Sequence, residues 1–252
     1  MNMPKEGQTV FTDIIRGEVS FENKLIDDQV LIKADGFPTY HFAVVVDDHA
    51  MKVTHVIRGE EWISSTPKHL VLYDMFGWEP PRYAHLSLFI NSDKQKMSKR
   101  HGDVSVADFR RKGFLPEALV NFIAFLGWNP GTEQEIYSLQ ELEQSFSFDR
   151  VQKTAAVFNE EKLVWYNKEW MKRLGAEEIA RRAVPFFEEY GVRYSAEDLE
   201  GIVTLGIERA GTLQELGEQS LFLCAEQITF DPKLLVWKKS DKEKAGTALL
   251  AL

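Results

Sequence analysis

The alternation of hydrophobic and polar residues at the start of the chain predicts β structure. Residues 8–36 hold two runs of β-branched and aromatic residues on either side of Arg16-Gly17, which predicts a hairpin. The next run, VLIKADG, ends in an Asp-Gly turn and predicts a further extended segment. The pattern changes at Pro38, because a proline at a first helical position before TYHFAVVVDDHAM predicts a helix that is apolar over much of its surface.

Strand and helix signals then alternate along the chain. A short β-branched run extends from Thr54 to Arg58, and Ser65-Thr66-Pro67 supplies a cap and a first-turn proline for a helix through KHLVLYDMFG. The segment from Tyr83 to Ile90 predicts another apolar strand. Such alternation predicts part of a parallel α/β sheet, in which ligands bind beyond the carboxyl ends of the strands. We therefore look for a site in the loops after Arg58 and Ile90.

Beyond Ser105 the signals are almost wholly helical. Helix starts are predicted at Pro116, at the capping box of Ser138 with Glu141, and at that of Thr212 with Glu215. We place one domain boundary near residues 103–115 and a looser one near 165–172. The pattern thus predicts an α/β region followed by an all-α region.

The composition is that of a globular protein and limits its environment. The 252 residues are 44% hydrophobic and 27% charged, and 30 Lys and Arg against 39 Asp and Glu give a formal net charge of -9. This balance argues against a nucleic-acid partner unless basic residues gather locally. A single cysteine, Cys224, cannot form an internal disulfide or a paired zinc ligand, and no apolar run approaches the roughly 20 residues that span a bilayer. With no secretory signal at the start, we expect a cytoplasmic protein without a membrane segment.

Several kinds of site are not predicted. The six histidines do not fall at metal-ligand spacing with carboxylates, and Asp47, Asp48 and His49 point in different directions on a helix, so we expect no metal site. Glycine-rich phosphate loops of the GxGxxG or GxxxxGK type are absent, as is a GxSxG nucleophile elbow. The candidate chemistry is therefore carried by charged loops.

The first such loop is basic. Residues 94–100, KQKMSKR, hold four cations in seven positions directly after a predicted strand. A solvated basic turn is the simpler interpretation of a charge run. The functional interpretation is that the lysines reach polyphosphate oxygens, because positioned ammonium groups stabilise the negative charge that develops in phosphoryl or nucleotidyl transfer.

The second loop follows the strand that ends at Arg58, in RGEEW. An ordinary surface ion pair of Arg58 with Glu60 or Glu61 would be worth only about 0 to 1 kcal/mol. A guanidinium at this place can instead hold a substrate carboxylate with two hydrogen bonds and so distinguish an acid from its amide. Tyr40 could add a hydroxyl donor and Trp62 could wall the pocket, although for each aromatic residue alone core packing is the commoner role.

Together these segments resemble a known family. TYHFAVVVDDHAMKVTHVIRGEEW, STPKHLVLYDMFGW, KMSKRHGDVSV and GFLPEALVNFIAFLGW, in this order, are similar to bacterial glutamyl-tRNA synthetase, a class I aminoacyl-tRNA synthetase. The resemblance is clear from about residue 8 to about residue 170 and fainter through the helical tail. It implies the second part of a Rossmann-like catalytic domain followed by a helical stem-contact region and a helical bundle.

The resemblance also implies roles for individual residues. In the family the KMSKS-type loop stabilises the pyrophosphate of ATP, so Lys96 and Lys99 match catalytic positions. The glutamate contacts match Tyr40, Arg58 and Trp62, while Val44 stands where some members carry Asn. The expected ATP-binding residues are Glu61, Lys96, Met97, Ser98, Lys99 and Arg100.

Three segments and several partners follow from the same resemblance. Residues 1–103 would form the second half of the catalytic domain, 104–168 the stem-contact region, and 169–252 a truncated proximal anticodon-binding bundle. The implied partners are the glutamate-accepting tRNA, L-glutamate and ATP with Mg²⁺, without a zinc site, in a monomeric enzyme. Arg58 favours glutamate over glutamine, because a cation interacts more strongly with a charged carboxylate than with a neutral amide.

One family motif is absent from the sequence. No HIGH-type tetrapeptide occurs, and the chain resembles an internal fragment that also stops before the distal anticodon-binding domain. We therefore expect the isolated chain to be inactive in aminoacylation. The alternative is a catalytically silent module that binds RNA or another protein through its helices. A third interpretation, an unrelated helical interaction protein, predicts that Tyr40, Arg58, Trp62 and Lys99 are scattered over the surface.

Overall fold

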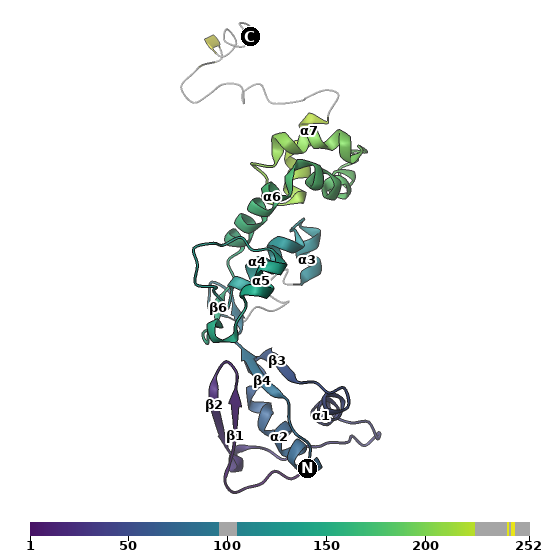
Figure 1. Cartoon of the computed structure of the whole chain (residues 1–252). Helices are drawn as coiled ribbons and strands as arrows, with labels where there is room; N and C mark the ends of the chain where they lie inside the picture. Colours follow the sequence, from purple (N-terminus) through teal and green to yellow (C-terminus); the bar gives the residue numbers. More distant parts are fainter. Residues whose placement is uncertain (96–104, 225–240, 242, 245–252) are drawn as a thin grey trace. The chain divides into compact units, whose positions relative to one another are not determined.

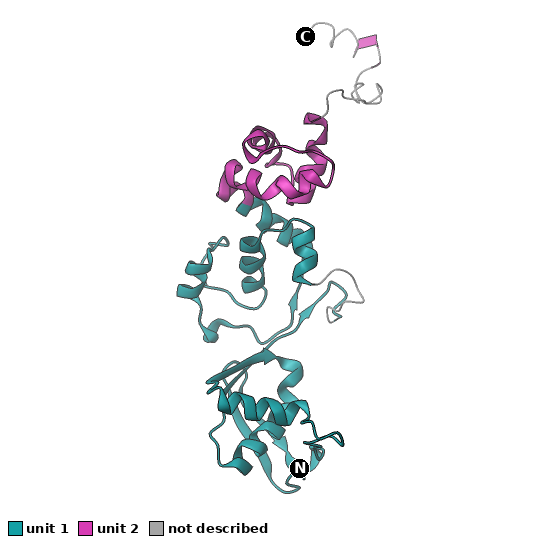
Figure 2. Cartoon of the chain, turned by 90° about the vertical axis from the view of Figure 1, so that its right-hand side faces the viewer, with its two compact units in different colours: residues 1–170 teal, residues 171–252 magenta. Residues whose placement is uncertain are grey.

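The computed structural model describes residues 1–95, 105–224, 241 and 243–244 (Figure 1). The chain divides into two compact units, residues 1–170 and residues 171–252 (Figure 2). Each unit is described by itself below. The assignment of three functional segments, 1–103, 104–168 and 169–252, stays a prediction.

The predicted hairpin is confirmed. Strands β1 (Gln8–Asp13) and β2 (Gly17–Glu22) pair antiparallel, in register from Gln8 opposite Glu22 to Asp13 opposite Gly17. The turn between them requires a positive φ at Gly17, which is 83° and favours glycine. The Asp13 carboxylate also accepts the backbone N–H groups of Ile15 and Arg16, each at 2.9 Å, which closes the turn.

The sheet contains the expected parallel strands. Strands β3 (His55–Gly59) and β4 (Arg82–Leu86) pair parallel, and β1 pairs parallel with β4 at Asp13. The strand order is β2-β1-β4-β3, so β4 lies between β1 and β3 (Figure 1). In this register Arg58 is the direct neighbour of His85. The α/β expectation is thereby confirmed.

Two helices accompany the sheet; the first starts later than predicted, and the second starts where predicted, with Pro67 in its first turn, but lacks the expected side-chain cap. Helix α1 (Tyr40–Ala50) begins two residues after Pro38, which forms an isolated bridge with Ile32 instead. Helix α2 (Thr66–Phe76) continues directly from the 3-10 helix η2 (Glu60–Ser65), so Ser65 makes no side-chain cap. Val45 of α1 packs with Leu72 and Tyr73 of α2 in a buried cluster.

The predicted strand Tyr83–Ile90 is wrong as one element. It is broken after Leu86, and the short strand β5 (Phe89–Ile90) pairs parallel with β6 (Ala156–Val157) in a second sheet. At the break, Leu88 donates its backbone N–H to the Glu60 carboxylate at 3.3 Å. At this point the backbone N–H of Leu88 therefore bonds to a side chain instead of to a neighbouring strand.

The rest of the first unit is mainly helical, as predicted. Its further elements are η1 (Asn23–Leu25), α3 (Val106–Arg111), α4 (Pro116–Phe125), α5 (Leu139–Ser145), η4 (Phe148–Arg150) and the start of α6 (Glu160–Glu188). The capping box of Ser138 with Glu141 is confirmed. A buried cluster that includes Ile15 and Ala84 with Trp128 and Tyr137 joins the sheet to these helices.

The second unit continues α6, which is interrupted at Gly175 where φ is 82°. It adds helices α7 (Ala196–Gly206) and α8 (Leu213–Ser220) and the 3-10 helix η5 (Leu221–Leu223). Thr212 caps α8, but Glu215 accepts the N–H of Gly211 rather than closing the predicted box. Among the described residues, no helix combines the length and apolar character that crossing a membrane requires.

Candidate functional site

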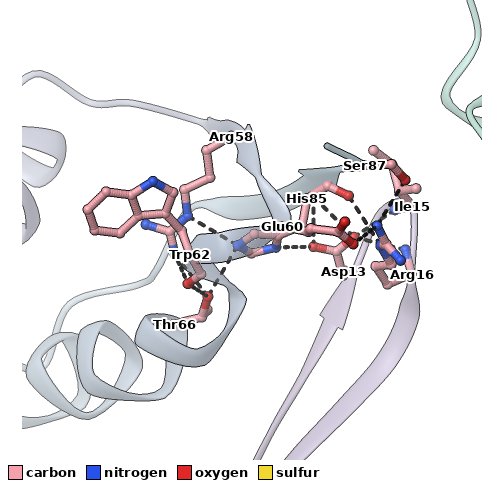
Figure 3. Close-up of polar contacts among 9 residues, drawn as sticks. All are labelled: Asp13, Ile15, Arg16, Arg58, Glu60, Trp62, Thr66, His85 and Ser87. Carbon is pink, nitrogen blue, oxygen red and sulfur yellow. Dashed lines mark hydrogen bonds and ion pairs between the residues drawn. The ribbon is translucent and has the colours of Figure 1, made fainter. Parts of the chain in front are cut away.

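Arg58 and His85 form the centre of the candidate site. Their strands β3 and β4 place them side by side in parallel register, and Arg58 Nε donates to His85 Nε2 at 3.1 Å (Figure 3). Each lies near the carboxyl end of its strand, where ligands of open α/β sheets bind. The sheet therefore holds the Arg58 guanidinium at the edge where the sequence predicts a site.

A second contact fixes the other side of the same guanidinium. Arg58 Nη2 donates to Thr66 Oγ1 at 2.8 Å and to the Trp62 carbonyl oxygen at 3.4 Å (Figure 3). Thr66 is fully buried at the start of α2, and its hydroxyl can donate in turn to the Trp62 carbonyl. Within the described residues, these hydrogen bonds use Nε and Nη2 of Arg58 but not Nη1. The N–H groups of Nη1 can therefore donate to a ligand.

Behind His85 lies a buried carboxylate. His85 Nδ1 is 2.6 Å from Asp13 Oδ2, and both side chains are fully buried. Burial would raise the pKa of Asp13, but hydrogen bonds from Arg16, His85 and Ile15 outweigh it and leave the pKa below its ordinary value. Asp13 is therefore an anion at neutral pH.

The protonation of His85 follows from its neighbours. Burial lowers the pKa of His85, and the Arg58 charge lowers it further, against the opposing effect of Asp13. His85 is then neutral at pH 7, with a proton on only one ring nitrogen. The anionic Asp13 requires that proton on Nδ1, so Nε2 presents a lone pair to the Nε–H of Arg58.

Aromatic rings border the guanidinium. The rings of Tyr40 and Trp62 lie 5.0 Å apart, and the Arg58 Cζ atom lies 6.0 Å from the Trp62 ring and 5.5 Å from that of Tyr83. Tyr40 is 52% exposed, so its ring can meet a ligand. Cation–π contacts at this distance stabilise the charge of Arg58 without occupying its donors.

The structure brings together three of the predicted site residues. Tyr40, Arg58 and Trp62 form one cluster, which contradicts the scattered placement expected of an unrelated helical protein. Glu61 lies on the exposed side of η2, with its carboxylate folded against Gly59. The predicted loop residues Lys96, Met97, Ser98, Lys99 and Arg100 lie outside the described residues.

An ion pair next to this site was not predicted. Arg16 Nη2 lies 2.5 Å from Glu60 Oε2, and Arg16 also donates to Ser87 Oγ at 3.0 Å (Figure 3). A further hydrogen bond, at 2.9 Å, runs from Arg16 to the Lys153 carbonyl oxygen. Glu60 is therefore the partner of Arg16, and the hydrogen bonds that hold Arg58 end on other groups. The Arg16 side chain connects the hairpin turn to the start of η2 and to the loop before β6.

A pair of histidines lies beside the aromatic rings. His41 Nδ1 is 2.9 Å from His69 Nε2, and the His41 ring lies 6.4 Å from the Trp62 ring. Burial lowers the pKa of His69 to about 3, with Arg58 and His41 adding to the effect. Within the described residues no group of three or more His, Cys, Asp or Glu side chains could hold a metal ion.

The sequence contained one signal for the missed residues. His85 interrupts the apolar segment YAHLSLFI, and a polar residue buried in a strand needs a partner. Nothing local identifies that partner, because Asp13 is separated from His85 by 72 positions.

The geometry agrees with the class of proteins found by sequence comparison. Residues 1–165 match the family model described as tRNA synthetases class I (E and Q), catalytic domain. The parallel strands, the cationic site at their carboxyl ends and the helices that follow fit this class, the class I aminoacyl-tRNA synthetases. The chain belongs to the glutamate and glutamine family of these synthetases, which confirms the resemblance read from the sequence.

Individual relatives narrow the comparison. The chain is 48% identical to a glutamate–tRNA ligase of Dehalococcoides mccartyi over 99% of its own length and 52% of that protein. It is 55% identical to the glutamate–tRNA ligase of Prosthecochloris aestuarii over 94% of its length and 46% of the relative. The chain thus spans about half the length of the curated relatives it matches.

Solved structures give the same family. A glutamate–tRNA synthetase from Elizabethkingia anophelis superimposes with a TM-score of 0.81 at 38% identity, covering 92% of this chain and 50% of that one. A glutamate tRNA ligase from Elizabethkingia meningosepticum in complex with its amino acid gives a TM-score of 0.82 at 36% identity, over 98% of this chain and 52% of that one. The predicted fold class is confirmed by these neighbours.

Proposed function

We propose that this chain contributes to a glutamate–tRNA ligase, in which it binds the amino acid and the polyphosphate of ATP. The observation that carries the proposal is the Arg58 guanidinium, which is held by His85 and Thr66 at the carboxyl end of β3 beside Tyr40 and Trp62. A cation fixed in this way suits the side-chain carboxylate of L-glutamate better than the neutral amide of glutamine.

The proposed reaction has two steps. The glutamate α-carboxylate attacks the α-phosphorus of ATP, pyrophosphate leaves, and the terminal adenosine hydroxyl of tRNA then attacks the acyl carbonyl and releases AMP. Lys96 and Lys99 stabilise the negative charge on the leaving pyrophosphate, with Met97, Ser98 and Arg100 in the same ATP-binding loop and Glu61 beside it. Mg²⁺ would arrive with the ATP phosphates, in keeping with the oxygen ligands it prefers.

The helices have a proposed partner in tRNA. Residues 104–168 would contact the stem of the glutamate-accepting tRNA, and residues 169–252 would lie toward its anticodon. The family name and the names of the relatives support tRNA as the partner. We further propose that the 252-residue chain alone is inactive, because its sequence contains no HIGH-type motif.

Calorimetry with the 252-residue chain tests the amino-acid specificity. L-Glutamate should bind at least about tenfold more tightly than L-glutamine, a difference of about 1.4 kcal/mol. Equal affinity for the two amino acids would contradict the role of Arg58. The rim of the site is accessible to either ligand, since Tyr40 is exposed.

A pyrophosphate exchange assay tests the proposed inactivity separately. The purified chain should catalyse no glutamate-dependent exchange of pyrophosphate into ATP, while a complete relative assayed in parallel should do so. Exchange by the chain alone would contradict its inactivity. Binding of tRNA with neither exchange nor any binding of L-glutamate would favour the alternative of a silent RNA-binding module.

A further inference from the structure

Asp13, His85 and Arg58 form one line of contacts across three adjacent strands. Asp13 ends β1, His85 lies in β4 and Arg58 lies in β3, in the order in which these strands neighbour one another. Figure 3 shows the imidazole between the carboxylate and the guanidinium, bonded to both. The line joins a fully buried anion to the cation of the candidate site without direct contact between the two charges.

The order of the three groups determines the direction of each hydrogen bond. Arg58 Nε–H is always a donor, so His85 Nε2 must accept. His85 Nδ1 must then carry the ring proton and donate it to Asp13 Oδ2. The backbone N–H groups of Ile15 and Arg16 hold the Asp13 carboxylate in place, so this arrangement has little freedom.

The hydrogen bonds described for Arg58 all end on neutral acceptors. These are the imidazole of His85, the hydroxyl of Thr66 and the carbonyl of Trp62. A protein carboxylate bonded directly to the guanidinium would neutralise its positive charge and so weaken its attraction for a ligand carboxylate. The neutral imidazole fixes the guanidinium and leaves that charge for the ligand.

We propose that Asp13 and His85 are positioning residues that fix the Arg58 guanidinium in the direction required to bind a ligand carboxylate. The ligand part of this inference rests on the proposed function, whereas the effect on Arg58 itself does not. Arginine has up to about 2 kcal/mol of side-chain rotamer entropy to lose, so a guanidinium oriented in advance binds more tightly than a free one.

Two substitutions of His85 separate this role from simple packing. His85→Gln places a side-chain amide near the position of Nε2, whose oxygen can still accept from Arg58. His85→Asn instead retains a group near Nδ1 that can donate to Asp13, but it loses the acceptor for Arg58. Both variants remove the ring from a fully buried position, so a purely structural role would affect both in the same direction.

Asp13→Asn provides a third variant with a different prediction. The Asn oxygen would continue to accept from Ile15 and Arg16, which turns the amide NH₂ toward His85 Nδ1. This also removes the acceptor of the His85 backbone N–H, which lies 3.1 Å from Asp13 Oδ2. A donor facing Nδ1 favours the tautomer with the ring proton on Nε2, where two donors, Nε2–H and the Nε–H of Arg58, would face each other. The variant should therefore favour the opposite tautomer of His85.

Nitrogen-15 NMR of the 252-residue chain tests the arrangement without any ligand. At pH 7 the wild type should show a neutral His85 with its proton on Nδ1, and an Arg58 Nε–H that exchanges more slowly than that of exposed Arg82. This slow exchange should persist in His85→Gln and be lost in His85→Asn and Asp13→Asn. An Nε2–H tautomer in the wild type, or equal Arg58 exchange in both His85 variants, would overturn the proposal.

Calorimetry with L-glutamate then tests the consequence for binding. The affinity should fall by about tenfold or more in His85→Asn and Asp13→Asn and by about threefold or less in His85→Gln. Thermal unfolding of each variant, with the exposed His55→Asn and His55→Gln as a matched pair, measures the structural cost.

Together, NMR and calorimetry distinguish failure of the proposed function from failure of the positioning role. A wild type that binds no glutamate contradicts the proposed function, while the NMR arm still decides whether Asp13 and His85 position Arg58. A wild type that binds glutamate with equal losses in His85→Gln and His85→Asn contradicts the positioning role and leaves the proposed function standing.

Discussion

The guanidinium of Arg16 pairs with the carboxylate of Glu60 at 2.5 Å, across a sequence separation of 44 residues. The two side chains are 21% and 31% exposed, and Arg16 also holds Ser87 and the Lys153 carbonyl. The pair therefore joins the hairpin turn to the start of η2, and Arg16 also reaches the loop before β6. Its partial burial distinguishes it from an ordinary surface ion pair.

Removing the Glu60 charge should destabilise the first unit. Glu60→Gln leaves Arg16 without its anion, and we expect the free energy of unfolding to fall by about 1 to 3 kcal/mol. Urea unfolding followed by tryptophan fluorescence measures this as a lower midpoint with an unchanged slope. The control is Lys5→Ala, which breaks an ion pair whose two side chains are more than half exposed and should change stability by less than about 0.5 kcal/mol. Equal effects of the two substitutions would contradict this role of Glu60.

Replacing Arg58 by Lys tests the geometry of the guanidinium. A single ammonium group cannot contact His85, Thr66 and a ligand carboxylate in the same arrangement. Arg58→Lys should weaken L-glutamate binding by about tenfold or more in calorimetry. Arg82→Lys, at the exposed start of β4, should leave binding unchanged. Unchanged affinity in Arg58→Lys would show that only its charge matters.

Lys99 tests the predicted ATP loop. In a complete synthetase that contains this chain, Lys99→Ala should lower the rate of glutamate-dependent pyrophosphate exchange by about 100-fold to 1000-fold, because it removes one charge that stabilises the leaving pyrophosphate. The thermal unfolding temperature should change little. Lys52→Ala, on the exposed turn after α1, is the matched control. A near-normal exchange rate in Lys99→Ala would remove the loop from the mechanism.

His69 should make the stability of the protein depend on pH. Burial, together with Arg58 and His41, lowers its pKa to about 3 in the folded state, whereas an unfolded histidine binds its proton near pH 6.5. Between these values the unfolded state binds more protons, so the free energy of unfolding falls as the pH falls, by up to about 1.4 kcal/mol per pH unit. The lowered pKa of His85 acts with the same sign.

Urea unfolding of His69→Gln between pH 7 and pH 4.5 measures this contribution. The variant should show a smaller dependence of unfolding free energy on pH than the wild type, whatever its stability at pH 7. His55→Gln alters an exposed histidine of β3 and should retain the wild-type dependence. An identical slope in His69→Gln and the wild type would contradict the proton linkage assigned to His69.

Local signals predicted most elements because their causes are local. The hairpin around Arg16-Gly17 follows from β-rich runs and a glycine in the turn, and the parallel strands follow from alternation with helices. The start of α1 was predicted too early, at Pro38. Thr39, which precedes α1, is held by hydrogen bonds to Val30 and Leu31, and local helix signals do not reveal such contacts. The segment from Tyr83 to Ile90 was predicted as one strand because its apolar run does not reveal that β5 pairs with β6.

The sequence by itself determined the types of the main elements, the family, and the clustering of Tyr40, Arg58 and Trp62 that the family implies. Only the tertiary structure decided that His85 and Asp13 stand behind Arg58 and that Glu60 pairs with Arg16. The physical reason is the strand order β2-β1-β4-β3, which places β4 between β1 and β3 and so makes neighbours of residues far apart in the chain. Hydrophobic periodicity encodes which face of a strand is buried, but it contains no information on which strand lies beside it.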